Sequence, residues 1–329
     1  MRIIITILIL LFLSSGAEIS LGIEAVEITE WAVPWASTRP RDPYVDQLSR
    51  VWFVGQKGDY LAYLEPNNSR FKRFDLEPGT GPHNLIIDAN GKVWYAGHRK
   101  AHIGKLDPVT GKITRFPMVN PEARDPHTLV FDQKGDIWFT VQWGNFVGKL
   151  STKTGKMHLI PVPTSRARPY GIIIDNRNQP WIAQFGTNKL STIDPKRIEL
   201  QEIPLPREDA RPRRLALTSN GNIWYVDYAQ GFLGRLNPGT GKVQEWSTPG
   251  GNSARPYGMT ADDRNRLWFV ECGPQPNRLV GFEPSTQKFF SVNTIGSGGG
   301  SVRHLVFHNP SREIWFGTDR NTIGRARVP

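Results

Sequence analysis

Seven tryptophans recur at a nearly constant interval along this chain of 329 residues. Successive members are 42 to 47 residues apart, and each lies in a short apolar or aromatic run. The seven are Trp52, Trp94, Trp138, Trp181, Trp224, Trp268 and Trp315. A β-rich repeat of about forty residues is typical of propeller blades, which bury their faces only against neighbouring blades. The spacing therefore predicts one ring of seven blades instead of two separate domains.

The third repeat, residues 126–162, shows the internal pattern of a blade most clearly. It contains four short runs rich in β-branched and aromatic residues, separated by Gly-, Asn- and Ser-containing turns. That pattern predicts four antiparallel strands joined by tight turns.

The last repeat lacks a fourth strand before the chain ends at Pro329. The missing strand has a candidate at the other end of the chain, because residues 26–34 resemble the fourth-strand segment 243–249. We therefore expect an all-β fold, a seven-bladed β-propeller of four-stranded antiparallel blades. An N-terminal strand would complete the last blade and remove two exposed sheet edges.

The first residues have the composition of an export signal. A basic start at Arg2 precedes an apolar run, residues 3–13, and small residues follow at Ser15 and Ala17. Eleven apolar residues are short for a bilayer span, so we predict a signal peptide, residues 1–17, and a single propeller domain, residues 18–329. The protein is then periplasmic or secreted, with no membrane attachment after cleavage. A retained membrane anchor is the alternative.

The formal net charge is +11, but Lys and Arg are spread over all repeats without a basic run. This indicates a solvated basic surface and no nucleic-acid partner. Cys272 is the single cysteine, so the chain forms no internal disulfide. We expect a monomer.

Two rings of side chains are predicted to surround one mouth of the central channel. In an antiparallel blade, the start of the innermost strand and the end of the second strand lie on the same face. The first ring follows a turn proline in six blades and an arginine in the seventh, and comprises Tyr44, His83, His127, Tyr170, Arg213, Tyr257 and His304. The second ring lies shortly after each repeat tryptophan and comprises Gln56, His98, Gln142, Phe185, Tyr228, Cys272 and Asp319. Such a mouth is a candidate ligand site, since it is concave and built from loops on a rigid scaffold.

The residue types at this mouth allow several kinds of chemistry. Histidine and tyrosine can transfer protons, and Asp227, Glu271 and Asp319 could hold a hard cation. Three histidines also permit a transition metal such as copper or zinc. Arginines beside the ring suit an anionic or carbonyl-rich ligand, or belong to the solvated rim. The alternative is that these side chains line the channel and have no role beyond structure.

Several phrases resemble the streptogramin B lyase (virginiamycin B lyase) family. They include residues 254–260 (ARPYGMT), 137–140 (IWFT), 267–271 (LWFVE), 146–150 (FVGKL) and 322–325 (TIGR). The resemblance implies the propeller fold and a Mg²⁺-dependent lyase. Such a lyase opens a cyclic depsipeptide at its ester by elimination, with a histidine as the base and the metal stabilising enolate character.

The site residues of the family can be matched to positions in this chain in two ways. On the last two blades, His304 would be the base and Asp319 a metal ligand, while Tyr257 and Val302 stand where the family has histidine and glutamate. On the second and third blades, His83 and Asp125-Pro126-His127 reproduce the family's Pro-His and acid-Pro-His pattern, with His127 as the base.

The leading hypothesis is an exported lyase-like propeller that acts on or binds a cyclic or ester-containing small molecule. Its catalytic candidates are His304 and His127, and Mg²⁺ is the implied cofactor. The substrate-binding candidates are Tyr44, His83, Tyr170, Arg213 and Tyr257. The metal-ligand candidates are Asp319, Asp125 and Glu271. The alternatives are a non-catalytic periplasmic binding or scaffold propeller and a metal-dependent, lactonase-like hydrolase.

Overall fold

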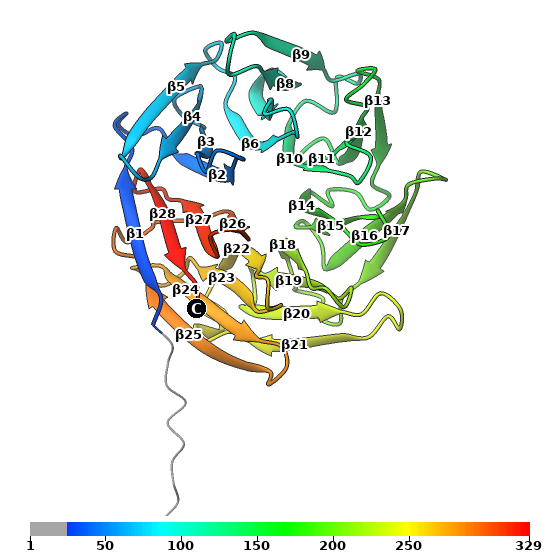
Figure 1. The fold of residues 1–329 in the computed structure, drawn as a ribbon. Coiled ribbons are helices and arrows are strands. Elements are labelled where there is room, and N and C mark those ends of the chain that lie inside the picture. Colours follow the sequence, from blue (N-terminus) through cyan, green and yellow to red (C-terminus); the bar gives the residue numbers. More distant parts are fainter. Residues whose placement is uncertain (1–24) are drawn as a thin grey trace, which may run out of the picture.

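The computed structural model describes residues 25–329, which form a ring of seven four-stranded antiparallel sheets around a common axis (Figure 1). The predicted signal peptide and its cleavage position lie outside the described residues. In the described part of the chain, no helix is long and apolar enough to cross a membrane.

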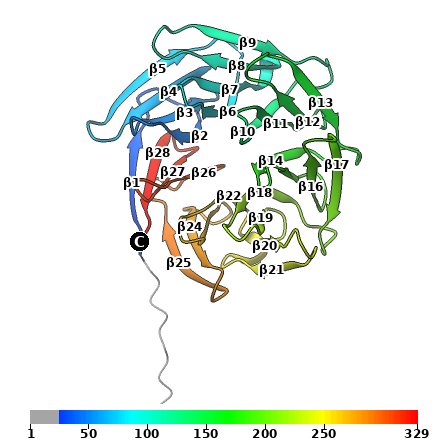
Figure 2. The same cartoon turned by 45° about the vertical axis from the view of Figure 1, so that its right-hand side comes forward.

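In each blade, four strands follow one another from the centre of the ring outward (Figures 1 and 2). The innermost strands are β2 (Pro40–Val45), β6 (Pro82–Ile87), β10 (Pro126–Phe131), β14 (Pro169–Ile174), β18 (Pro212–Leu217), β22 (Pro256–Ala261) and β26 (Leu305–His308). The second strands are β3 (Val51–Gly55), β7 (Val93–Gly97), β11 (Ile137–Val141), β15 (Pro180–Gln184), β19 (Ile223–Asp227), β23 (Leu267–Glu271) and β27 (Glu313–Gly317).

The outer half of each blade is more exposed. The third strands are β4 (Tyr60–Glu65), β8 (His102–Leu106), β12 (Phe146–Leu150), β16 (Lys189–Asp194), β20 (Phe232–Leu236), β24 (Arg278–Glu283) and β28 (Thr322–Arg327). The outermost strands are β5 (Arg70–Asp75), β9 (Ile113–Pro117), β13 (Met157–Pro161), β17 (Glu199–Pro204), β21 (Val243–Ser247), β25 (Lys288–Thr294) and β1 (Glu27–Ala32). Two single-turn 3₁₀ helices, η1 (His98–Lys100) and η2 (Gly251–Ser253), lie in connections.

The predicted closure of the ring is confirmed. Strand β1 pairs antiparallel with β28 from Glu27 opposite Arg327 to Ala32 opposite Thr322, and becomes the outer strand of the seventh blade. Trp31 of β1 stacks on Trp315 with ring centroids 5.6 Å apart. The two ends of the chain are therefore held in one sheet.

The hydrophobic core lies between blades. Trp94 of the second blade, for example, shares one apolar cluster with Phe139 and Leu150 of the third. All seven repeat tryptophans are at most 2% exposed. In six blades the indole N–H donates to a side chain six residues earlier, as Trp138 does to Asp132 at 3.2 Å, while that side chain also orders the preceding turn. The repeat tryptophan thus fixes both the interface between blades and the turn that leads into the second strand.

Glycine in the third strand makes room for the aromatic residue after the tryptophan. At Gly148, an added Cβ would lie 2.0 Å from the ring of Phe139. The glycine in the motif FVGKL is therefore a packing requirement of the blade.

Candidate functional site

The innermost strands begin with a local irregularity that turns side chains toward the channel axis. In all but the seventh blade, the pairing of the innermost strand with the second strand shifts register near the start of the innermost strand. Before that proline, Arg39, Arg168 and Arg255 adopt positive φ angles of 48° to 52°. Such angles are uncommon for residues other than glycine, and strained backbone of this kind often accompanies function.

The pairing register identifies the side chains that meet at the mouth. The proline of each innermost strand lies opposite the residue three positions after the repeat tryptophan, as Pro82 lies opposite Gly97. In the first blade this proline is Pro40, opposite Gly55. The inner ring therefore comprises Arg41, His83, His127, Tyr170, Arg213, Tyr257 and Arg303.

Two predicted members of the first ring occupy other depths. Tyr44 pairs with Trp52, so it matches Ile86 of the second blade and lies further down the channel. His304 precedes Leu305, which pairs with Phe316, so His304 matches Asn84 and lies one layer below the ring. This second layer comprises Asp42, Asn84, Thr128, Gly171, Arg214, Gly258 and His304.

Arg213 occupies an aromatic cage. Its guanidinium carbon lies 3.7 Å from the ring centroid of Tyr257, 4.3 Å from those of Phe185 and Tyr228, and 4.9 Å from that of Tyr170. A guanidinium over aromatic faces gains electrostatic attraction that is larger when water is excluded. The cage brings together two predicted ligand-binding tyrosines and the predicted arginine.

The hydroxyl groups of Tyr170 and Tyr257 are hydrogen-bonded to each other. Burial would raise the pKa of Tyr170, but the nearby Arg213, Arg41 and Arg214 outweigh it and lower the pKa to about 7. Burial and the neighbouring Tyr170 raise the pKa of Tyr257. The two pKa values are therefore shifted in opposite directions, and Tyr170 is the more acidic hydroxyl of the pair.

Three histidines gather on the second and third blades, next to Tyr170 of the cage. The ring centroids of His83 and His127 are 3.5 Å apart, and that of His98 lies 5.2 Å from His83. Burial, followed by repulsion from Arg41 for His83 and from Arg214 for His127, lowers both pKa values well below the usual range. His83 Nδ1 and His127 Nε2 have no hydrogen-bond partner among the described residues. The ring thus contains two neutral imidazoles with free nitrogens, and His127 also contacts Tyr170 at 4.1 Å between centroids.

A buried ion network holds the second layer together. Asp42 pairs with Arg41 at 3.0 Å and with Arg214 at 3.1 Å, and it also accepts a hydrogen bond from Asn84. Arg214 donates further to Thr128 and to the backbone carbonyl of Arg303. The backbones of the fourth and fifth blades come close together at Gly171, where an added Cβ would lie 2.7 Å from the carbonyl oxygen of Arg213.

The three carboxylates predicted as metal ligands are separated and already engaged. Asp125 accepts the backbone N–H groups of Trp143 and Gly144 at 2.6 and 2.9 Å. Glu271 pairs with Arg278 and accepts the N–H of Gly250. Asp319 pairs with Arg303 and lies 3.6 Å from Arg39.

A hard cation needs several oxygen ligands converging on one point. Between residues 25 and 329, no group of three or more His, Cys, Asp or Glu side chains is arranged to hold a metal ion. The residues present therefore do not fit a Mg²⁺ site of the kind that the resemblance implies.

Positive charge dominates the mouth. Arg39 and Arg303 share the single carboxylate of Asp319, and burial together with repulsion from Arg303 lowers the pKa of Arg39. The described neighbours of Arg213 are aromatic rings, including that of Tyr170, and none of them is a carboxylate. This arrangement can accept an anionic or carbonyl-rich group from solvent.

Sequence reasoning missed Arg41 and Asp42, although one signal could have found them. The inner-ring residue precedes the repeat tryptophan by eleven positions in the second to sixth blades, and the same count from Trp52 reaches Arg41. In the seventh blade Val306 pairs with Trp315, nine positions later, whereas Ile86 pairs with Trp94, eight positions later. Because this connection is longer, the inner-ring position of the seventh blade falls on Arg303. A fixed spacing of eleven positions before the repeat tryptophan does not find this residue.

Solved structures with the same fold include two lyases. A streptogramin B lyase structure is 24% identical, with a TM-score of 0.83, and the match covers 92% of this chain and 98% of that one. Virginiamycin B lyase from Staphylococcus aureus is 22% identical, with a TM-score of 0.84 and coverage of 93% and 100%. A catalytically inactive variant of the latter, solved with quinupristin, matches equally well. No curated protein sequence matches this chain.

A profile of the virginiamycin B lyase family matches residues 12–279, which is most of the chain. The predicted resemblance is confirmed by this match and by the seven-bladed fold that the lyase structures share with it. The chain belongs to the virginiamycin B lyase family.

Proposed function

We propose that this chain binds a small, oxygen-rich molecule with a carboxylate or similar anionic group at the mouth of the propeller. The observation that carries the proposal is the caged guanidinium of Arg213, which has aromatic faces around it and no carboxylate among its described neighbours. Arg39 and Arg303 add positive charge that Asp319 only partly balances. Aromatic walls favour a ligand with a flat or cyclic apolar part next to its anionic group.

The N-terminal sequence supports export as part of this proposal. Residues 1–17 have the order of a signal peptide, with a basic start, an apolar run and small residues. The ligand would then be met in the periplasm or outside the cell. The proposal does not rely on Mg²⁺, because Asp125, Glu271 and Asp319 each have protein partners and do not converge.

Binding can be tested by calorimetry with an aromatic carboxylate, benzoate, and its uncharged analogue benzamide. We expect benzoate to bind more tightly than benzamide, and its affinity to fall as salt is added. Arg213→Gln and Arg303→Gln should each weaken benzoate binding about tenfold or more. Arg70→Gln is the matched control, since Arg70 is exposed on β5 away from the mouth. Equal binding of both probes, or unchanged binding in both mouth variants, would contradict the proposal.

A second candidate function, elimination without a bound metal, is favoured by the pKa of Tyr170. A phenolate available near neutral pH, in contact with Arg213, could take the proton α to a carbonyl while the guanidinium balances the developing enolate charge. The C–H bond and the ester C–O bond break, a C=C bond forms, the carboxylate leaves and the proton resides on Tyr170. His127, neutral and 4.1 Å away between ring centroids, is the alternative base.

Incubation with quinupristin followed by mass spectrometry separates these possibilities. Elimination opens the ring without a change of mass, whereas a lactonase-like hydrolase adds one water. Under elimination, Tyr170→Phe should abolish turnover while keeping binding, and His127→Gln and His304→Gln should be compared beside it. No product, together with intact benzoate binding, would leave ligand binding as the function of the mouth.

A further inference from the structure

The channel contains a cavity of about 330 Å³ below the second layer, distinct from the mouth. Its walls come from the middle and end of the innermost strands, and no inner-ring residue lines it. Aliphatic and aromatic side chains dominate, including Ile86, Val130, Ile173, Leu217 and Phe307. This volume lies at the lower end of the range for small-molecule pockets, which are mostly apolar with a few convergent polar groups.

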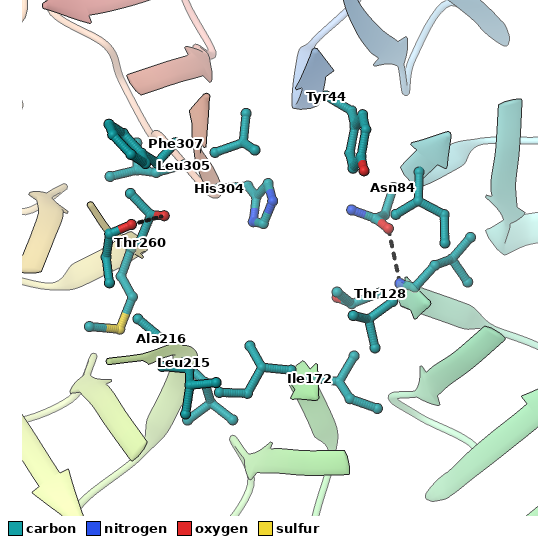
Figure 3. A pocket seen from close by; sticks show the side chains of 18 of the residues that line it. Tyr44, Asn84, Thr128, Ile172, Leu215, Ala216, Thr260, His304, Leu305 and Phe307 are labelled. Atoms are coloured by element: carbon teal, nitrogen blue, oxygen red, sulfur yellow. Dashed lines mark hydrogen bonds between the residues drawn. The ribbon is translucent and has the colours of Figure 1, made fainter. Parts of the chain in front are cut away.

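The end of the cavity nearest the mouth is polar. His304, Asn84 and Thr128 line it there, and Figure 3 shows the imidazole of His304 projecting into the space between the surrounding side chains. Thr128 already accepts a hydrogen bond from Arg214, and Asn84 already donates one to Asp42. His304 Nδ1 has no hydrogen-bond partner within the described residues 25–329. A buried nitrogen without a partner is costly, unless a ligand or water satisfies it.

Charge at this end favours an anion. Arg41 and Arg214 carry two positive charges against the single negative charge of Asp42. Burial, followed by repulsion from Arg214, lowers the pKa of His304 to about 4, so the imidazole is neutral at pH 7 and one of its nitrogens carries a proton to donate. A carboxylate here would balance the excess positive charge and could accept a hydrogen bond from His304.

We propose that the channel cavity binds an amphipathic monocarboxylate, with its apolar chain against the aliphatic walls and its carboxylate at His304. This site is distinct from the mouth, because the buried ion pair of Asp42 and Arg214 in the second layer lies between them. The cavity walls come from all seven blades and offer contacts to an apolar chain, while the polar end determines which end of the chain enters first (Figure 3).

The test is calorimetry of the full mature protein with hexanoate, octanoate and octanol. Octanoate should bind more tightly than hexanoate by about fourfold per added methylene, as expected for burial of apolar surface. Octanoate should also bind at least tenfold more tightly than octanol. His304→Leu should remove that preference for the carboxylate while octanol binding persists.

Filling the cavity should abolish binding of both octyl probes. Thr260→Trp and Ala261→Trp each add bulk to a residue that lines the cavity. Val109→Trp is the control, because Val109 is 89% exposed on a surface turn. Circular dichroism checks the fold of each variant, and either cavity variant suffices if the other fails to fold. The proposal is overturned if octanoate does not bind, if octanol binds equally well, or if a folded cavity variant binds octanoate as the wild type does.

Discussion

Asp42 and Arg214 form an ion pair of 3.1 Å that joins the first and fifth blades across the channel. The two residues are 172 positions apart in the chain, and both are almost fully buried. Arg214 reaches two further blades through Thr128 and the carbonyl of Arg303. The centre of the propeller is therefore not an open pore at this depth, but a layer of polar side chains that ties several blades together.

Asp42→Asn should destabilise the protein strongly. The change leaves Arg41 and Arg214 buried without their carboxylate, and loss of one partner from a buried ion pair costs about 3–5 kcal/mol. Asn also tolerates the positive φ of 49° at this position, so the backbone is not the cause. Urea unfolding measures the effect. Asp75→Asn is the control, because its ion pair with Arg73 is exposed, and equal stability of the two variants would contradict the expectation.

The same residue should make stability sensitive to acid. Burial would raise the pKa of Asp42, but Arg41 and Arg214 outweigh burial and lower it. A carboxyl whose pKa is lowered by folding stabilises the protein above its unfolded pKa of about 4, and this contribution is lost as the pH falls below that value. The free energy of unfolding should therefore fall between pH 5 and pH 2, and less steeply in Asp42→Asn. Parallel curves for the two proteins would exclude Asp42 as a contributor.

Tyr170 should ionise about three pH units below an ordinary tyrosine, whose pKa is about 10. Absorbance of phenolate near 295 nm, recorded between pH 5 and pH 9, should show one early transition near pH 7 that Tyr170→Phe removes. Because folding lowers this pKa, the contribution of Tyr170 to stability grows as the pH rises from about 7 to about 10. Tyr257→Phe, which removes the hydrogen bond to the phenolate, should raise the transition pH. A transition that survives in Tyr170→Phe would assign it to another group.

The fold could be predicted because one physical constraint repeats seven times. Every blade must bury its tryptophan against a neighbour, so the interval of 42 to 47 residues is visible without an alignment. The closure by β1 could also be predicted, since the last repeat visibly lacks a strand. These features depend on local patterns, which a single sequence displays.

The site could be predicted only in part, because its depth depends on register. The repeat pattern predicts one ring position for five residues, and the structure brings all five together: His83, His127, Tyr170, Arg213 and Tyr257. Tyr44 lies deeper because the ring position of the first blade follows Pro40, and His304 lies deeper because the connection in the seventh blade is one residue longer. A shift of one residue in a strand moves a side chain to another face and another depth, and composition gives no warning of it.

The carboxylates show a second limit of sequence reasoning. Asp125, Glu271 and Asp319 looked available as metal ligands, but their partners are backbone N–H groups and arginines that neighbouring segments supply. Which acid is already paired is a property of the assembled ring. The resemblance could suggest the ligands, whereas only the contacts reveal that they are engaged.

In five blades, an aspartate six residues before the repeat tryptophan should stabilise the blade. Asp132 accepts hydrogen bonds from the indole of Trp138 and from the backbone N–H groups of Lys134 and Asp136. Asp132→Ala leaves a buried indole N–H unsatisfied and loosens the turn, so we expect a loss of about 2–3 kcal/mol in urea unfolding. Asn309→Ala in the seventh blade is the matched control, because Trp315 Nε1 already has no hydrogen-bond partner among the described residues. Similar losses in both variants would refute the role of this contact.

Glu30 should hold the ring closed. Its carboxylate accepts the backbone N–H of Ser297 at 2.7 Å, the hydroxyl of Ser297 at 2.6 Å and that of Thr322 at 2.7 Å, which fixes β1 to the sixth-to-seventh blade connection and to β28. Glu30→Ala removes three hydrogen bonds to a charged acceptor, each worth roughly 1.5–3 kcal/mol when made, although water replaces part of them.

We expect this variant to open locally before it unfolds globally, because β1 is an edge strand at a chain end. Hydrogen exchange should speed up in β1 and β28 while β11, on the far side of the ring, keeps its protection. Glu27→Ala is the control, since its ion pair with Arg327 is exposed and worth little. Uniform acceleration in all blades would mean that closure is not a separable step, and unchanged exchange in β1 would mean that Trp31 and the strand pairing suffice without Glu30.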